Sequence, residues 1–110
     1  MSGWYELSKT SSGQFRFVLK AANAETILVS EQYTTVAAAK NGIASVQTNS
    51  PLDERYDRKE AKDGKPYFNL KAANHQIIGT SEQYSSEAAR DKGIASVKTN
   101  GPTTQIKEKF

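Results

Sequence analysis

The sequence predicts an α+β fold in which two copies of one strand-strand-strand-helix unit share a single, mainly antiparallel sheet carrying two helices on one face. The first observation is an internal repeat, because residues 17–51 return as residues 68–102 with no gap. The second is that each copy begins with alternating apolar and polar residues and ends in a helical pattern. The third is size, since half of this chain is too short to hold an independent core.

Two strands joined by a glycine turn are expected at the start of each unit. The first strand spans residues 4–9 in one copy and 55–58 in the other, and Gly13 and Gly64 mark the turns. The second strand begins at Phe15, where apolar side chains alternate with basic ones, and it returns in the second copy. A period of two predicts strands with one buried face.

A hairpin turn and a short third strand follow in each unit. Asn23 and Asn74 are placed in the turns, because Asn tolerates the left-handed backbone conformation. Residues 26–29 and 76–80 are expected to form the third strands. A tight turn predicts that the second and third strands are antiparallel.

One helix with recognisable ends completes each unit. The hydroxyl pairs at residues 34–35 and 85–86 can cap the free N–H groups of the first turn. The Asn-Ser-Pro stretch at 49–51 and the Asn-Gly-Pro stretch at 100–102 predict a left-handed stop followed by proline. These signals bound two helices of similar length.

Gly42 and Gly93 occupy equivalent positions in the middle of the two predicted helices. A glycine there costs about 1 kcal/mol relative to alanine. Gly42 lies at helical spacing from Ala38 and Val46, on the face expected to point inward. We therefore expect the helix backbone to approach the rest of the fold closely at both glycines.

An extended stretch is expected after each helix, at residues 52–55 in the first unit and 103–107 in the second. Three strands and a helix leave an open sheet edge, and a further strand given to the other half would close both edges. The chain is therefore predicted to be one domain, 1–110, with repeat 1 at 4–54 and repeat 2 at 55–107. Because the repeats can pair within one chain, we expect a monomer.

Composition excludes several classes of function. The sequence has no cysteine, which rules out disulfides, thiolate metal sites and cysteine nucleophiles. Its 15 basic and 12 acidic residues give a net charge of +3 and are interspersed, as in a solvated surface. The first residues show no secretory signal, and no apolar run is long enough to span a bilayer. The expected location is the cytoplasm.

Three repeated motifs carry a resemblance to a known family: Leu-Lys-Ala-Ala-Asn at 19–23 and 70–74, Ser-Glu-Gln-Tyr at 30–33 and 81–84, and Gly-Ile-Ala-Ser-Val at 42–46 and 93–97. From Trp4 to about Thr103 the chain resembles the bacterial YegP-like family, a domain of unknown function often found as tandem repeats. The resemblance implies tandem β3-α-β units in one sheet, with C-terminal strands swapped between repeats. It brings no established activity or catalytic residues. Ala24 and His75 stand where the family usually has glycine.

Residues with catalytic or metal-binding chemistry are few. His75 is the only histidine, and as an unrepeated turn residue it is interpreted as solvated. Ser30 and Ser81 have no repeated His or Lys at an activating position. We interpret the Ser-Glu-Gln-Tyr step as local structure, in which Ser and Glu satisfy backbone donors and Tyr plugs the core edge. No acidic cluster has metal-ligand spacing, so we predict no catalytic residues, no metal and no cofactor.

Arg16, Lys20 and Lys71 are the weak candidates for a binding surface. Strand alternation places them on the sheet face opposite the core, which the helices should leave bare. Phe15, Phe17 and Phe68 alternate to the opposite face from these lysines and are interpreted as core residues, whereas proteins that bind single-stranded nucleic acid stack bases on exposed aromatic rings. Nucleic-acid binding is therefore predicted to be weak or absent.

The function itself is not specified by these patterns. The best interpretation is a small soluble bacterial protein that acts as a non-enzymatic interaction or ligand-binding module. Two alternatives stay open: a weak nucleic-acid binder acting through the open sheet face, and a small-molecule binder or enzyme at the groove between the repeats. Steep salt dependence would favour the first alternative, and a concave apolar pocket with convergent polar groups the second.

Overall fold

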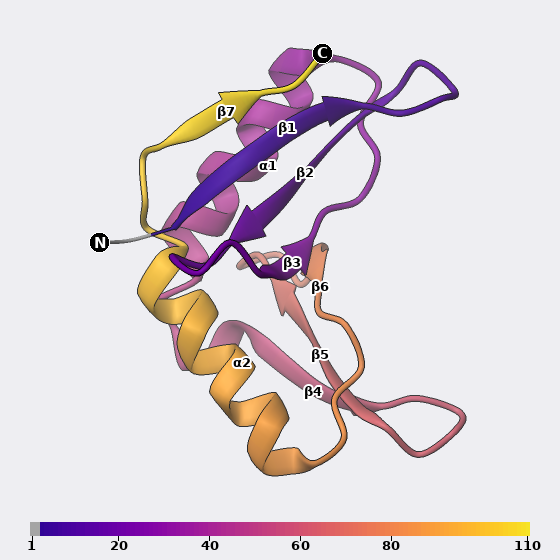
Figure 1. Cartoon of the computed structure of the whole chain (residues 1–110), viewed down its shortest axis with the longest axis vertical. Helices are drawn as coiled ribbons and strands as arrows, with labels where there is room; N and C mark the ends of the chain where they lie inside the picture. Colours follow the sequence, from indigo (N-terminus) through magenta and orange to yellow (C-terminus); the bar gives the residue numbers. More distant parts are fainter. Residues whose placement is uncertain (1–2) are drawn as a thin grey trace.

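The computed structural model describes residues 3–110 (Figure 1). The first half contains β1 (Trp4–Lys9), β2 (Phe15–Lys20), β3 (Thr26–Val29) and α1 (Val36–Asn49). A short 3-10 helix, η1 (Asp53–Arg55), leads into the second half, which contains β4 (Tyr56–Glu60), β5 (Pro66–Lys71), β6 (Ile77–Thr80), α2 (Glu87–Asn100) and β7 (Ile106–Glu108). This order of elements confirms the predicted α+β fold.

One sheet contains all the strands, in the order β4-β5-β6-β3-β2-β1-β7. Neighbouring strands are antiparallel except β1 and β7, which are parallel. The two halves meet between β3 and β6, where Val29 pairs with Thr80. These residues are equivalent in the internal repeat, so a pseudo-two-fold axis passes between them.

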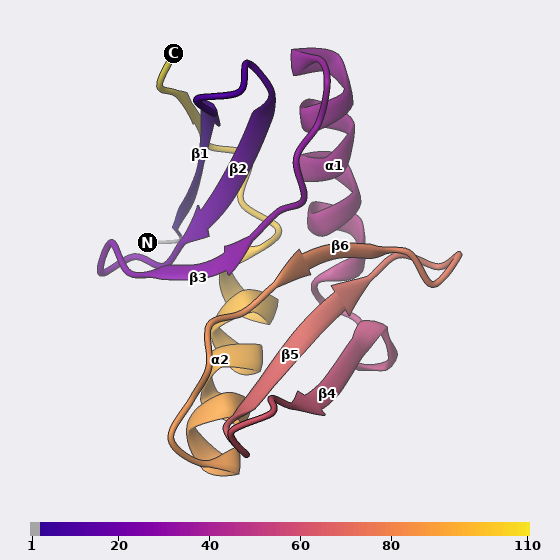
Figure 2. The ribbon, with the colours of Figure 1, turned by 90° about the vertical axis from the view of Figure 1, so that its right-hand side faces the viewer.

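A shared core forms between the sheet and the two helices. Tyr5, Phe17 and Leu19 from the first half, and Phe68 and Leu70 from the second, are fully buried. α1 contacts β2 of its own half and also β5 and β6, while α2 contacts β5 and also β2 and β3. Figure 2 shows α1 running from the first half down to β6. Each helix therefore buries strands of both repeats.

The helices begin as predicted. The Thr35 hydroxyl accepts a hydrogen bond of 3.0 Å from the Ala38 N–H, and the Ser86 hydroxyl accepts one of 3.1 Å from the Ala89 N–H. Both capping residues have extended backbone, as an N-cap requires. The repeated hydroxyls therefore define the start of each helix.

The helix ends differ from the predicted left-handed stop. The C-caps, Ser50 and Gly101, have right-handed backbone with φ of −59° and −57°. Each cap N–H donates to the carbonyl four residues earlier, on Val46 or Val97. Gly101 is required by packing rather than by its dihedral angles, because a Cβ there would collide with the Ser50 side chain and the Val97 carbonyl.

The hairpin turns also differ from the prediction at one position. Ala24 and His75, and not the preceding asparagines, adopt left-handed backbone, with φ of 71° and 69°. The Asn23 side-chain oxygen Oδ1 accepts a hydrogen bond of 3.1 Å from the Glu25 N–H, and Asn74 Oδ1 accepts the equivalent bond of 3.1 Å from the Gln76 N–H. The asparagine side chains therefore mimic a backbone turn, and the strained conformation falls on the next residue.

Replacing the two left-handed residues by glycine should stabilise the chain. Ala24→Gly and His75→Gly are each expected to raise the free energy of unfolding by about 0.5–1 kcal/mol, because glycine adopts this backbone conformation without the Cβ clash. Urea denaturation measures the change. Ala22→Gly, at an exposed position of the same turn with no positive φ, is the control and should not stabilise. A fall in the midpoint for both variants would contradict the interpretation.

The segments after the helices confirm the swapped arrangement, with a change of detail. β4 follows α1 but pairs with β5 of the second repeat, while β7 follows α2 but pairs with β1 of the first repeat. The strand after each helix therefore pairs with a strand of the other repeat. The predicted extended stretch at 52–55 is wrong, because Asp53–Arg55 forms η1 and the Asp53 carbonyl accepts from the Tyr56 N–H. This compact turn joins α1 directly to β4. The strand predicted at 103–107 is shorter and begins at Ile106.

Candidate functional site

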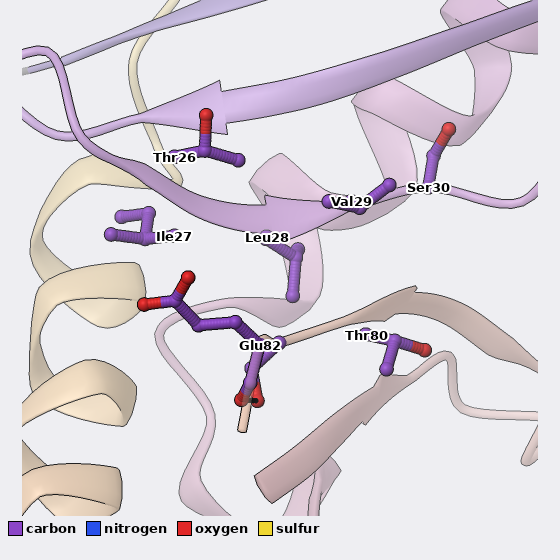
Figure 3. Close-up of a pocket in the computed structure, with 8 residues that line it drawn as sticks. Thr26, Ile27, Leu28, Val29, Ser30, Thr80 and Glu82 are labelled. Atoms are coloured by element: carbon purple, nitrogen blue, oxygen red, sulfur yellow. Dashed lines mark hydrogen bonds between the residues drawn. The ribbon is translucent and has the colours of Figure 1, made fainter. Parts of the chain in front are cut away.

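A cleft opens where β3 and β6 separate on one side of the Val29–Thr80 pair. Its volume is about 320 Å³. One wall is formed by β3 and Ser30, and the other by the end of β6 and the loop that follows it. The lining residues are Thr26, Ile27, Leu28, Val29, Ser30, Thr80, Ser81 and Glu82. Figure 3 shows the Glu82 side chain reaching toward Ile27.

A β-bulge aims Ile27 into this region. Leu19 pairs with Leu28, but the next residue of β2, Lys20, pairs with Thr26, which leaves Ile27 as the extra residue. Ile27 is buried, and Figure 3 shows it directed toward α2. Bulges commonly redirect a side chain in this way. Ile27 therefore connects the first repeat to the helix of the second and forms the apolar floor of the cleft.

A second hollow of about 250 Å³ continues the cleft toward α2. The two spaces share Thr26, Ile27 and Glu82. The second space adds polar groups from three elements: Glu25 from the hairpin of the first repeat, Tyr84 from the loop after β6, and Lys92 from α2. We call the combined space the inter-repeat cleft. It has an apolar floor at one end and charged groups at the other.

The pKa of the Tyr84 hydroxyl reflects the negative charge in the cleft. Its ring stacks on Phe68 with a centroid distance of 6.3 Å. Burial raises the pKa of the Tyr84 hydroxyl, and the carboxylates of Glu82 and Glu25 raise it further. Those carboxylates come from different repeats, so the fold brings two negative groups to one aromatic hydroxyl.

Comparison of the two copies shows which polar groups are particular to this cleft. Glu82 recurs as Glu31, but Glu25 is replaced by Gln76 and Lys92 by Asn41 in the equivalent positions. The symmetry is also broken at the axis, where Leu28 fills the space left by Gly79. The charged end of the cleft therefore occurs on only one side of the pseudo-two-fold axis.

The repeated serines are occupied in backbone bonding, as predicted. The Ser30 hydroxyl accepts from the Phe17 N–H at 2.9 Å and donates to the Glu31 carbonyl at 2.7 Å. Ser81 makes the equivalent bonds to Phe68 and Glu82. The prediction for the glutamate is wrong for Glu82, because its carboxylate extends into the cleft instead of meeting a backbone donor (Figure 3).

The remaining candidates from the sequence lie apart from the cleft. His75 is exposed in the turn before β6. Arg16 and Lys20 lie on the open face of β2, whereas Lys71 lies on β5 in the other half, 3.0 Å from Asp57. The structure therefore does not bring the three basic candidates together.

Residues 3–110 contain neither a cluster of metal ligands nor a helix that could span a membrane. No group of three or more His, Asp or Glu side chains in this range could hold a metal ion. Neither α1 nor α2 is long and apolar enough to cross a membrane.

Sequence reasoning missed Glu25 and Lys92. Both are single exposed charged residues with no periodic or motif signal. Only the difference between the two copies distinguishes them, since their counterparts are uncharged.

The fold defines a class of protein: a tandem β3-α-β repeat with one continuous sheet and a post-helix strand exchanged between the halves. The family model described as a domain of unknown function (DUF1508) matches the chain twice, at residues 11–57 and 61–108. The chain therefore belongs to this family, as the repeated motifs predicted.

Relatives and solved structures agree with this assignment. A UPF0339 protein of Shewanella oneidensis is 68% identical, covering 98% of both chains, and the UPF0339 protein YegP of Escherichia coli K12 is 61% identical with the same coverage. The solution NMR structure of the S. oneidensis protein SO3888 has a TM-score of 0.92, covering 98% of this chain and 92% of that one. The NMR structure of E. coli yegP, a protein of unknown function at 61% identity, has a TM-score of 0.93, with 98% and 93% covered.

Proposed function

We propose that the chain is a non-enzymatic binding module of the bacterial cytoplasm, and that a small amphipathic molecule with a positively charged group binds in the inter-repeat cleft. The observation that carries the proposal is the meeting of Glu25 and Glu82, from different repeats, beside the apolar side chain of Ile27. An apolar surface with a few convergent polar groups is the usual form of a small-ligand site. Lys92 offsets only one of the two carboxylates.

Binding is favoured over catalysis by the chemistry of the lining. A hydrolytic or transfer reaction needs an activated nucleophile or a general acid–base pair. Ser81 lines the cleft, but its hydroxyl already donates to the Glu82 carbonyl and accepts from the Phe68 N–H. His75, the only imidazole of the sequence, is not among the lining residues. A carboxylate pair beside an apolar wall suits recognition of an ammonium group.

Titration of the isotope-labelled chain with phenethylamine tests the proposal, and phenethyl alcohol serves as the uncharged analogue. Amide shift changes are expected at Ile27, Glu82 and Lys92, with weaker binding of the alcohol. Glu82→Gln should weaken binding of the amine by about two- to fivefold, the scale of a partly exposed ion pair.

The internal repeat supplies a matched control. Glu31→Gln makes the same chemical change at the equivalent position and should leave amine binding unchanged. Equal affinity for the amine and the alcohol, or equal effects of the two variants, would contradict the proposal.

A further inference from the structure

Trp4 lies at the centre of a basic surface on the open face of the first half of the sheet. Its neighbours along β1 and β2, Tyr5 and Leu19, are fully buried, so Trp4 and Lys20 point to the face that the helices leave uncovered. Trp4 is paired with Lys20 across the strands. Figure 1 shows β1, β2 and β7 side by side on this side of the molecule, with α1 behind them.

The exchanged strand β7 adds two further lysines to this surface. The Lys107 ammonium lies 4.2 Å from the centroid of the Trp4 ring. The backbone N–H of Lys109 donates to the Leu7 carbonyl at 2.8 Å, which fixes the chain beside β1. Residues 103–110 thus bring Lys107 and Lys109 to a tryptophan about 100 positions away in sequence.

One carboxylate stands among these groups. Glu6 accepts a hydrogen bond of 2.9 Å from the Trp4 indole N–H, which holds the ring in place. This bond lowers the pKa of Glu6, and Lys20, Lys109 and Lys107 lower it further. The surface therefore carries three lysines and one carboxylate, which leaves an excess of positive charge. We call Trp4, Glu6, Lys20, Lys107 and Lys109 the Trp4 surface.

The equivalent surface of the second half lacks these features. Arg55 replaces Trp4 in the repeat, and its guanidinium donates to the Asn49 side chain. Asp57 replaces Glu6 and pairs with Lys71 at 3.0 Å and Lys59 at 3.5 Å. No described strand lies beyond β4 in the sheet. The second half does carry Tyr67 across from Lys59, but among the described residues an aromatic ring under a lysine of an exchanged strand, with three lysines beside one carboxylate, occurs only on the first half.

We propose that the Trp4 surface binds single-stranded nucleic acid, with a base stacked on the indole and backbone phosphates on Lys20, Lys107 and Lys109. Proteins that bind single strands combine an aromatic platform with basic residues along the backbone path. An exposed cation over an aromatic ring is a weak interaction, and a stacked base is a stronger one. A base can therefore displace the Lys107 ammonium from the ring and leave it free for a phosphate. Paired bases in a duplex do not offer an unstacked face.

Trp4 is the only tryptophan of the chain, so its fluorescence reports on the site directly. Addition of a single-stranded oligothymidine of about ten nucleotides to the whole protein should quench the emission. Three phosphate contacts predict a log–log salt slope of about −2 for the association constant. Lys107→Ala combined with Lys109→Ala should weaken binding by about tenfold.

Lys59→Ala combined with Lys71→Ala removes the same number of charges from the second half and should leave affinity unchanged. Trp4→Leu, followed with a fluorescently labelled oligonucleotide, should weaken binding, and thermal melting confirms that each variant is folded. Three results would overturn the proposal: no quenching at low salt, equal affinity for duplex DNA, or equal affinity for polyglutamate, which would indicate a surface for acidic proteins.

Discussion

Gly42→Leu and Gly93→Leu should each lower the free energy of unfolding by roughly 1–3 kcal/mol or more, because the added side chain overpacks the core. A Cβ at Gly42 would collide with the Tyr33 hydroxyl and approach Phe17, and a Cβ at Gly93 would collide with the Tyr84 hydroxyl. Both glycines are buried on the inner face of their helices. The gain in helix propensity on replacing glycine, about 1 kcal/mol at most, opposes this cost but is smaller.

Chemical denaturation with matched controls shows whether the glycine-to-leucine substitutions lower or raise the free energy of unfolding. Ala44→Leu and Ala95→Leu add a leucine to the same helices at exposed positions and should change stability by less than about 0.5 kcal/mol. A second test uses the tyrosine. Gly93→Ala should cost less in a Tyr84→Phe background, because the colliding hydroxyl is gone. A rise in the denaturation midpoint for both glycine-to-leucine variants would show that these helix positions do not pack as described.

The same glycines show why the fold could be predicted from the sequence. Gly42 and Gly93 occupy equivalent positions on the apolar face of the two helices, and the strands alternate with a clear period of two. The helix pattern and the strand pattern therefore predict the same fold. The open sheet edges suggested the exchange of strands, and the resemblance to a tandem-repeat family made that prediction more definite. The errors occurred where a residue type has two physical explanations. Glycine after a helix can indicate left-handed backbone or close packing, and at Gly101 packing against Ser50 is the reason.

The candidate sites were less predictable, because they depend on how separate segments meet. Glu25 and Lys92 are 67 positions apart in the sequence, and only the divergence of β3 from β6 places them in one cleft. Trp4 appears in the sequence as an ordinary strand residue. Its basic surroundings arise from β7, a short and wholly exposed strand whose composition gives almost no strand signal. Pseudo-symmetry predicted that this strand exists, but not which side chains it would carry to Trp4.

Deletion of residues 103–110 should lower the free energy of unfolding by more than about 1 kcal/mol and promote self-association. The deletion removes the ladder between β1 and β7, in which the Tyr5 N–H donates to the Gln105 carbonyl and the Leu7 carbonyl accepts from Lys109. It also removes the ion pair of 3.0 Å between Lys40 and Glu108. The β1 edge would then present unpaired backbone groups, which pair readily with another chain. Denaturation and sedimentation measure the two effects.

Proline substitution separates the backbone ladder from the side chains of β7. The backbone of Gln105 and that of Lys109 both bond to β1, so alternation directs the Lys107 N–H toward β1 and the Ile106 N–H away from it. Lys107→Pro should therefore reproduce most of the destabilisation, whereas Ile106→Pro should cost much less. Lys107→Ala, which keeps the ladder, should lose only the exposed contact with Trp4, about 0.5–1 kcal/mol. Equal effects of the two prolines, or random-coil amide exchange at residues 106–109, would show that β7 does not hold the β1 edge.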